Sequence, residues 1–215
     1  MNSITFPKDE IQAGNPIKLG APPFLLSKNN RWIIVDENLR FFHSIHLEEQ
    51  EGKGDSLEMV FPNSGTYHVY IPYLNNQGKD QVIHERVQVG GGEAFSPEIH
   101  EEKMVAEISG FTVNLENGKD IKTLRNQGLE FTIFKDGVKV NEDDLEPNPQ
   151  IFAQLTMIRM EDKEWIHLHP GKDQFSTVYA EAFLEKPGMY RIWLEFNLTS
   201  EVYVADFTII AENER

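Results

Sequence analysis

The feature that most constrains the fold is an internal repeat with a constant offset. Four residues in the second half of the sequence stand 123 positions after similar residues in the first half, without gaps. They are His169, Gly188, Tyr190 and Trp193, which follow His46, Gly65, Tyr67 and Tyr70. A histidine, a turn glycine and two aromatic residues rarely recur in one register by chance. The sequence therefore predicts two copies of one structural module.

The length of the chain agrees with two modules. Its 215 residues make two domains of ordinary size, since domains cluster at about 100 to 150 residues. Three consecutive glycines at 90–92 mark the boundary, because such a run loses too much backbone entropy to hold a regular element. We expect a first module at 1–90, a glycine-rich and acidic linker at 91–103 and a second module at 104–215. The first module is expected to be shortened by a strand or two, because only about 30 residues precede its first clear strand.

Both modules are predicted to consist of short strands. Runs of β-branched and aromatic residues alternate with turn residues, and no stretch shows helical periodicity. Besides a short strand near 17–19, the predicted strands are 31–35, 39–47, 57–61, 66–74, 81–89, 104–108, 111–115, 129–134, 138–140, 151–160, 164–169, 177–183, 188–196 and 202–210. This pattern predicts an all-β protein with two tandem immunoglobulin-like antiparallel β-sandwich modules.

A Gly-x-Tyr sequence opens the next-to-last predicted strand of each module. It reads Gly65-Thr66-Tyr67 in the first module and Gly188-Met189-Tyr190 in the second. In immunoglobulin-like sandwiches a tyrosine at this place hydrogen-bonds back to the corner that precedes the strand. We therefore expect Tyr67 and Tyr190 to have equivalent surroundings.

The charge of the chain narrows the classes of partner. Thirty-five acidic and 20 basic residues give a formal net charge of −15. This charge repels the phosphates of nucleic acids and anionic lipid surfaces, so we expect neither as a partner. It suits a cationic ligand, or a solvated acidic surface with no such role, and the partner is left as an unknown protein or small ligand. No segment approaches the roughly 20 apolar residues of a membrane span, and the chain shows no signal peptide, so we expect a soluble chain.

The residue types required for enzymatic catalysis do not come together in the sequence. Cysteine is absent, which excludes disulfides, thiolate metal sites and a cysteine nucleophile. No Ser-His-Asp order, nucleophile elbow, phosphate-binding glycine loop or zincin helix is present. We therefore predict that the protein is not an enzyme and needs no organic cofactor.

One histidine pair is the main candidate for a metal site. His167 and His169 are two apart on a predicted strand, which would place both on one face with Cα atoms about 6.6–6.8 Å apart. Two imidazoles in this arrangement can share a copper or zinc ion if a third ligand comes from a neighbouring strand. The alternative is an exposed strand whose histidines bind water or acidic neighbours.

The first module has a weaker form of this pair. His43 and His46 are three apart, so on a straight strand they point to opposite faces unless a bulge intervenes. Ser44 stands where the offset would place His167, so we expect any metal site in the second module alone. The remaining histidines have no partner at ligand spacing and are expected to be solvated; they are His68, His84 and His100. The tryptophans would form a carbohydrate platform if exposed, but core packing is the favoured interpretation; they are Trp32, Trp165 and Trp193.

Two motifs carry a resemblance to known proteins. His167-Leu168-His169-Pro170 and Pro187-Gly188-Met189-Tyr190 resemble the His-x-His-Pro and Pro-Gly-x-Tyr of a bacterial group of extracytoplasmic tandem β-sandwich proteins. The resemblance covers 31–89 and 104–210, and the chain is also distantly similar to YtkA-like and CopC-like domains. It implies a non-catalytic binding or interaction module at the bacterial cell surface, with a copper- or zinc-binding protein as the alternative. A histidine that this group often carries in the first strand of the hairpin is Gln154 here.

Overall fold

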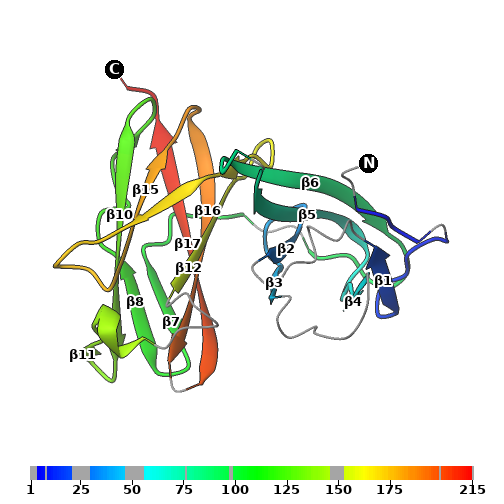
Figure 1. The fold of residues 1–215 in the computed structure, drawn as a ribbon, viewed down its shortest axis with the longest axis horizontal. Helices are drawn as coiled ribbons and strands as arrows, with labels where there is room; N and C mark the ends of the chain where they lie inside the picture. Colours follow the sequence, from blue (N-terminus) through cyan, green and yellow to red (C-terminus); the bar gives the residue numbers. More distant parts are fainter. Residues whose placement is uncertain are drawn as a thin grey trace. The chain divides into compact units, whose positions relative to one another are not determined.

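The chain is built almost entirely of β-strands (Figure 1). The structure is a computed structural model, and it describes residues 4–7, 9–20, 30–46, 56–75, 77–96, 99–145, 153–198 and 200–214. The chain divides into two compact units, Met1–Ile99 and His100–Arg215. Each unit is an immunoglobulin-like sandwich of mainly antiparallel sheets, with one short parallel pair in the second unit, so the predicted fold class is confirmed. None of the helical segments within these residues has the length and apolar character that crossing a membrane requires.

The first unit holds a four-stranded sheet and a two-stranded sheet. The larger has the order β3-β2-β5-β6, and β1 pairs with β4 in the smaller. The strands are β1 (Pro16–Gly20), β2 (Arg31–Asp36), β3 (Phe42–His46), β4 (Ser56–Val60), β5 (Gly65–Leu74) and β6 (Asp80–Val89). Alternate residues of β2 and β5, such as Trp32 and Val69, pack in the core against Leu19 and Leu57 of the smaller sheet.

The amino-terminal segment borders both sheets of the first unit. Thr5 forms an antiparallel bridge with Gly20 at the end of β1, and Gln12 forms a parallel bridge with Gly90 just beyond β6. Ile11 is buried in the same core. The sequence predicts mostly loop here with a short strand near 17–19, and β1 confirms that strand.

The second unit has a larger pair of sheets. One has the order β13-β12-β16-β17-β9, and the other has the order β14-β15-β10-β8-β7 with β11 paired to β10. The strands are β7 (Val105–Ile108), β8 (Phe111–Leu115), β9 (Ile121–Lys122), β10 (Asn126–Lys135), β11 (Val138–Lys139), β12 (Ala153–Arg159), β13 (Trp165–Ile166), β14 (Leu168–Gly171), β15 (Val178–Phe183), β16 (Gly188–Leu198) and β17 (Glu201–Glu212), and a 3-10 helix, η3 (Glu142–Asp144), follows β11. Aromatic rings link the two sheets across the core, as Phe131 of β10 and Phe207 of β17 do with ring centroids 5.2 Å apart.

The stretch 91–103, expected as a linker, is attached to the units at both ends. Ser64 forms a bridge with Ala94, and its N–H donates to the carbonyl oxygen of Glu93 at 3.1 Å. At the other end Lys103 forms a bridge with Thr208 of β17. The positive φ of Gly91, 69°, allows a turn beside Gln12, where a Cβ atom at this glycine would meet the glutamine side chain. The two units divide after Ile99, within the stretch expected as the linker.

One strand prediction is wrong in a way that affects the candidate metal site. The sequence predicts a single strand over 164–169, but β13 ends at Ile166 and β14 begins at Leu168. The first pairs with β12 and the second with β15, so the chain passes from one sheet to the other at His167. Ile166 and Leu168 both still contact the core, and this explains why the apolar alternation continues across the break.

The two tyrosine corners confirm the internal repeat in its contacts. Tyr67 OH donates to the carbonyl oxygen of Asn63 at 3.0 Å, and Tyr190 OH donates to that of Lys186 at 2.5 Å. In each unit the acceptor lies four residues before the tyrosine, and both tyrosines are fully buried. Gly65, which opens β5, has a φ of 136°, and its counterpart Gly188 has a φ of 140°, a region that other residues rarely adopt. The same corner therefore closes both sandwiches.

Replacing Tyr190 by Phe should destabilise the second unit without changing its fold. The substitution removes the hydroxyl and leaves the carbonyl group of Lys186 at the corner without its donor. We expect the free energy of unfolding to fall by about 1–2 kcal/mol, measured by urea titration of circular dichroism. Tyr179→Phe is the control, because that hydroxyl bonds to an exposed glutamate, and it should change the value by less than about 0.5 kcal/mol. Equal effects of the two substitutions would contradict the importance of the corner.

Candidate functional site

The structure does not bring His167 and His169 together on one strand. His167 lies in the connection between β13 and β14, whereas His169 is an exposed residue of β14 paired with Glu181. The expectation that one strand carries both histidines is therefore wrong. The reason is the crossing of the chain between the two sheets, which strand periodicity does not reveal.

His43 and His46 lie on opposite faces of β3, as their spacing predicts. The pairing of β2 with β3 runs without a bulge, with His43 opposite Ile34 and His46 opposite Arg31. His46 has Ser44 as a neighbour, with 3.5 Å between Nε2 and Oγ.

A metal site would require the described part of the fold to complete a ligand set around the four candidate histidines. Among the residues that the structure describes, no group of three or more His, Asp or Glu residues could hold a metal ion. Copper or zinc binding by His167 and His169, or by His43 and His46, stays a prediction. Titration of the wild type and of the His167→Ala/His169→Ala variant with each metal tests it.

Two other histidines, expected to be solvated, form a hydrogen-bonded cluster in the first unit. Nδ1 of His68 is 2.8 Å from Nε2 of His84, and Nε2 of His68 is 3.1 Å from Oε2 of Glu37. His68 is only 5% exposed, and the ring of His84 stacks on Tyr70 with centroids 4.3 Å apart. The expectation of solvent exposure is therefore wrong for His68, whereas His84 is exposed, as expected, but is hydrogen-bonded to His68. The pairing of Tyr70 with His84 across β5 and β6 brings the two imidazoles together, and a hairpin register deduced from the turn at 75–79 would have indicated it.

The electrostatics of this cluster keep one imidazole neutral. Burial, followed by the neighbouring His68, lowers the pKa of His84 to about 4. The carboxylate of Glu37 accepts from Nε2–H of His68, so Nδ1 of the neutral His68 accepts from Nε2–H of His84. A proton added to His84 would therefore enter at its Nδ1 and place a charge next to the buried His68. The cluster is thus ordered in its neutral form.

The equivalent place in the second unit holds ion pairs in place of histidines. Arg191 stands 123 positions after His68, and its Nη2 lies 2.9 Å from Oδ2 of Asp206. Lys103 Nζ binds the other oxygen of Asp206 at 2.6 Å. Burial acts to raise the pKa of Asp206, but the hydrogen bond from Lys103 and the charge of Arg191 outweigh it, and the pKa is lowered. This carboxylate therefore has structural partners already.

The outer face of the six-stranded sheet carries an aromatic ring that lies across two glycines. Tyr179 of β15 is paired with Gly171 of β14 on one side and with Glu130 of β10 on the other. A Cβ atom at Gly171 would come within 2.7 Å of Cδ1 of the ring, and one at Gly128 would come within 3.1 Å of Cε2. Opposite edges of the ring thus fill the space over the two glycines, and the ring spans three strands.

Two carboxylates flank this ring. Tyr179 OH donates to Oε1 of Glu181 at 3.2 Å, and Asn117 Nδ2 donates to Oε1 of Glu130 at the same distance. Burial raises the pKa of Tyr179, and the hydrogen bond to Glu181 and the charges of Glu181, Glu130 and Asp173 raise it further. The hydroxyl therefore stays protonated, and the ring lies among negative charges.

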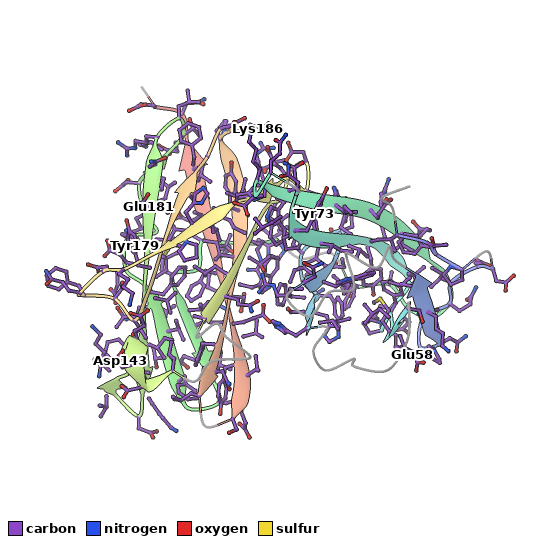
Figure 2. All side chains as sticks on the ribbon, in the orientation of Figure 1. Glu58, Tyr73, Asp143, Tyr179, Glu181 and Lys186 are labelled. Carbon is purple, nitrogen blue, oxygen red and sulfur yellow. The ribbon has the colours of Figure 1, made fainter. Side chains whose placement is uncertain are left out.

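We call this surface the Tyr179 face. It consists of Tyr179, Glu181 and Phe183 of β15, Gly128 and Glu130 of β10, and His169 and Gly171 of β14. Ala180 and Ala182, which alternate with the β15 members, point into the core. Phe183 is 46% exposed, and Figure 2 shows Tyr179 and Glu181 at successive outer positions of β15. The face is therefore a partly apolar, acidic surface on a rigid sheet.

Sequence reasoning missed this face because it looked to tryptophan for an aromatic platform. Trp32 and Trp193 are 0% and 2% exposed, so the predicted core packing holds for them. The missed signal was Gly128, which lies inside β10 although the predicted strand began one residue later. A glycine within a strand often marks the close approach of another group.

Comparison with solved structures finds similar chains at low identity. The fibronectin(III)-like modules of Clostridium thermocellum CbhA are 12% identical, with a TM-score of 0.28, over 98% of this chain and 95% of that one. The D00-D0 domain of Intimin is 13% identical, with a TM-score of 0.27, over 98% of each chain. SGBP-B of the Bacteroides ovatus mixed-linkage glucan utilization locus, solved with a mixed-linkage heptasaccharide, is 13% identical, with a TM-score of 0.25. That match covers 97% of this chain and 45% of the other, so this chain spans less than half of that protein's length.

One family model matches the second unit. It is described as Domain of unknown function (DUF8832), and it covers residues 106–213, about half of the chain. No curated protein matches the sequence. The likeness to YtkA-like and CopC-like domains has no support in these comparisons.

The stability of the first unit should depend on the protonation of His84. Because the folded-state pKa of about 4 lies below the ordinary value of 6.5, the unfolded chain binds the proton more readily between these values. This contribution to stability is therefore present above pH 6.5 and is lost as the pH falls toward 4. We expect the difference in free energy of unfolding between the wild type and His84→Gln to shrink across this window. Urea titrations at several pH values measure it, and a difference independent of pH would contradict the assignment.

Proposed function

The chain belongs to the DUF8832 family, and we propose that it is a non-catalytic β-sandwich module that binds a partner through the Tyr179 face. The observation that carries this proposal is the ring of Tyr179 laid over the glycines of two neighbouring strands. A glycine in a strand interior costs roughly 0.5–1 kcal/mol relative to alanine. An aromatic ring fixed at a surface offers a large contact area at a low cost in side-chain entropy. A binding role gives this arrangement a use.

The composition of the Tyr179 face supports binding. Aromatic side chains dominate the energetically important centres of interfaces, and polar groups at the rim add specificity. Here the ring of Tyr179 lies across β15 and its two neighbouring strands, and Phe183 adds apolar surface. Glu181 and His169 are exposed beside them. The sheet fixes all of these positions, so little order has to be gained when a partner docks.

The open form of the face supports a role without catalysis. Carboxylate and imidazole groups work in catalysis when their site excludes water and fixes the reacting atoms. Glu181 and His169 are instead exposed on the outer surface of a sheet. The same groups on an open surface suit reversible association.

We propose that the module works outside the cytoplasm of a bacterial cell. This location follows from the motifs at 167–170 and 187–190 that resemble extracytoplasmic tandem sandwich proteins. Fractionation of the producing cells, followed by detection of the chain in each fraction, tests it. Recovery in the cytoplasm alone would contradict the location and leave the binding role intact.

Tyr179→Ala should abolish most of the binding. We expect an affinity loss of about tenfold or more for whatever the wild type binds in a panel of neutral oligosaccharides and of basic, acidic and neutral peptides. Isothermal titration calorimetry measures the affinities. Tyr179→Phe keeps the ring and should remain within about threefold of the wild type.

Two controls distinguish a specific loss of binding from unfolding of the variant. Circular dichroism must show that Tyr179→Ala is folded, and Glu107→Gln, on β7 at the far side of the same sheet, should bind as the wild type does. A folded Tyr179→Ala variant with wild-type affinity would show that the partner docks elsewhere.

A further inference from the structure

We infer that the partner presents a lysine or arginine side chain to the Tyr179 face, with its cation over the ring of Tyr179 and beside Glu130 and Glu181. This inference rests on the proposed binding role and adds the chemistry of the partner. The partner meant is a protein segment with exposed basic residues. The inference follows from the ring, the two carboxylates and a comparison of the two units.

The ring and its hydroxyl favour a cation. Cations are attracted to the face of an aromatic ring by its quadrupole. Tyr179 OH donates a hydrogen bond to Glu181, which increases the electron density of the ring and strengthens this attraction. The ring also covers Gly128 and Gly171, so its position is fixed before a partner arrives.

The carboxylates next to the ring can each accept further hydrogen bonds from a basic partner. Asn117 binds one oxygen of Glu130, and Tyr179 binds one oxygen of Glu181. No lysine or arginine pairs with either carboxylate in the described part of the chain. A guanidinium or ammonium group would bind these oxygens by charge-assisted hydrogen bonds, which are stronger than neutral ones. The chain as a whole adds long-range attraction through its net charge of −15.

The internal repeat gives Glu181 a counterpart in the first unit, whose neighbours can be compared. The residues 123 positions before Tyr179, Glu181 and Phe183 are Ser56, Glu58 and Val60, which lie at the outer positions of β4. The glutamate thus recurs, and Val60 is 46% exposed, as Phe183 is. Opposite Glu58 the neighbouring strand β1 places Lys18.

In the second unit the β10 position opposite the glutamate carries no charge, and its β14 neighbour is His169. β10 places Gly128 opposite Glu181, where β1 has Lys18 opposite Glu58. The first unit thus supplies a basic residue from its own neighbouring strand. The second unit replaces that residue with a glycine and adds the ring of Tyr179. In the first unit Lys18 provides the cation next to the glutamate. In the second unit we assign this cation to the partner.

The spacing along β15 fits an extended segment. Outer positions of a strand repeat about every 6.6–6.8 Å, so Phe183 lies about 13 Å beyond Tyr179. An extended peptide that places a basic residue on Tyr179 can place an apolar residue on Phe183 four positions away. This match favours a protein segment over a free amine.

The test uses the full chain labelled with nitrogen-15. The probe is a capped peptide with a lysine and a leucine four residues apart in an otherwise neutral sequence, and the comparison probes replace its lysine by glutamate or are neutral oligosaccharides. We expect amide shifts with the lysine peptide at 128–130, 169–171 and 179–183. Both Tyr179→Ala and the Glu130→Gln/Glu181→Gln pair should weaken its binding about tenfold or more. The affinity should also fall as salt is raised from 0.05 to 0.5 M.

Glu58→Gln is the matched control, because it removes the same charge from the equivalent strand of the first unit and should change the affinity by less than about twofold. An equal loss in this variant would mean general attraction to an acidic chain and would overturn the inference. Shifts of the face with the oligosaccharides and not with the lysine peptide would overturn it too, while leaving the proposed binding role standing. No shift of the face with any probe would overturn the inference and remove the support for the binding role.

Discussion

Burial of alternate strand residues between two sheets is the constraint on which the rest of this structure depends. Along β5 and β16 the inward residues recur at the 123-residue offset: Val69 with Ile192, and Ile71 with Leu194. Tyr67 and Tyr190 begin these series and fix the corner through their hydroxyl groups. Since the core must be filled and the corner closed in both units, these positions keep one chemistry. The outward positions are under no such constraint.

The outward residues of the same strands differ accordingly. His68 and Arg191 are equivalent, yet one belongs to a neutral histidine cluster and the other to a set of ion pairs. Glu58 and Glu181 are also equivalent, but their neighbours on the adjacent strand are a lysine and a glycine. The duplicated fold thus provides two scaffolds with similar interiors and separate surfaces. The recurrence of the inward residues therefore says little about the chemistry of the outward surfaces.

This division explains what the sequence could predict. The repeat, the strands and the tyrosine corners depend on local periodicity and on single residue types such as Gly188, so pattern reasoning found them. The break at His167 was missed because Ile166 and Leu168 both stay in the core while the chain changes sheets, which leaves the apolar pattern intact. The contact of His68 with His84 depends on the register of β5 with β6. Register across a turn is not encoded in the spacing of the two residues alone.

The Tyr179 face depends on three strands that are far apart in the sequence, and the ring and the two glycines depend on one another. The ring can lie flat only because Gly128 and Gly171 lack side chains, and those two residues come from strands that meet only through β15. In the first unit a tyrosine at position 56 would lie opposite Gly20 of β1, and a ring that extended along β1 as that of Tyr179 does over Gly128 would meet Lys18 at the diagonal position. A change at one strand alone therefore could not produce the arrangement. Glycine weakens a strand, so the two bare positions are a cost to stability that the covering ring only partly offsets. Tyr179→Ala uncovers both glycines and removes the binding surface together, so its effects on stability and on binding have to be measured side by side, whereas Tyr179→Phe keeps the cover and removes only the hydroxyl group.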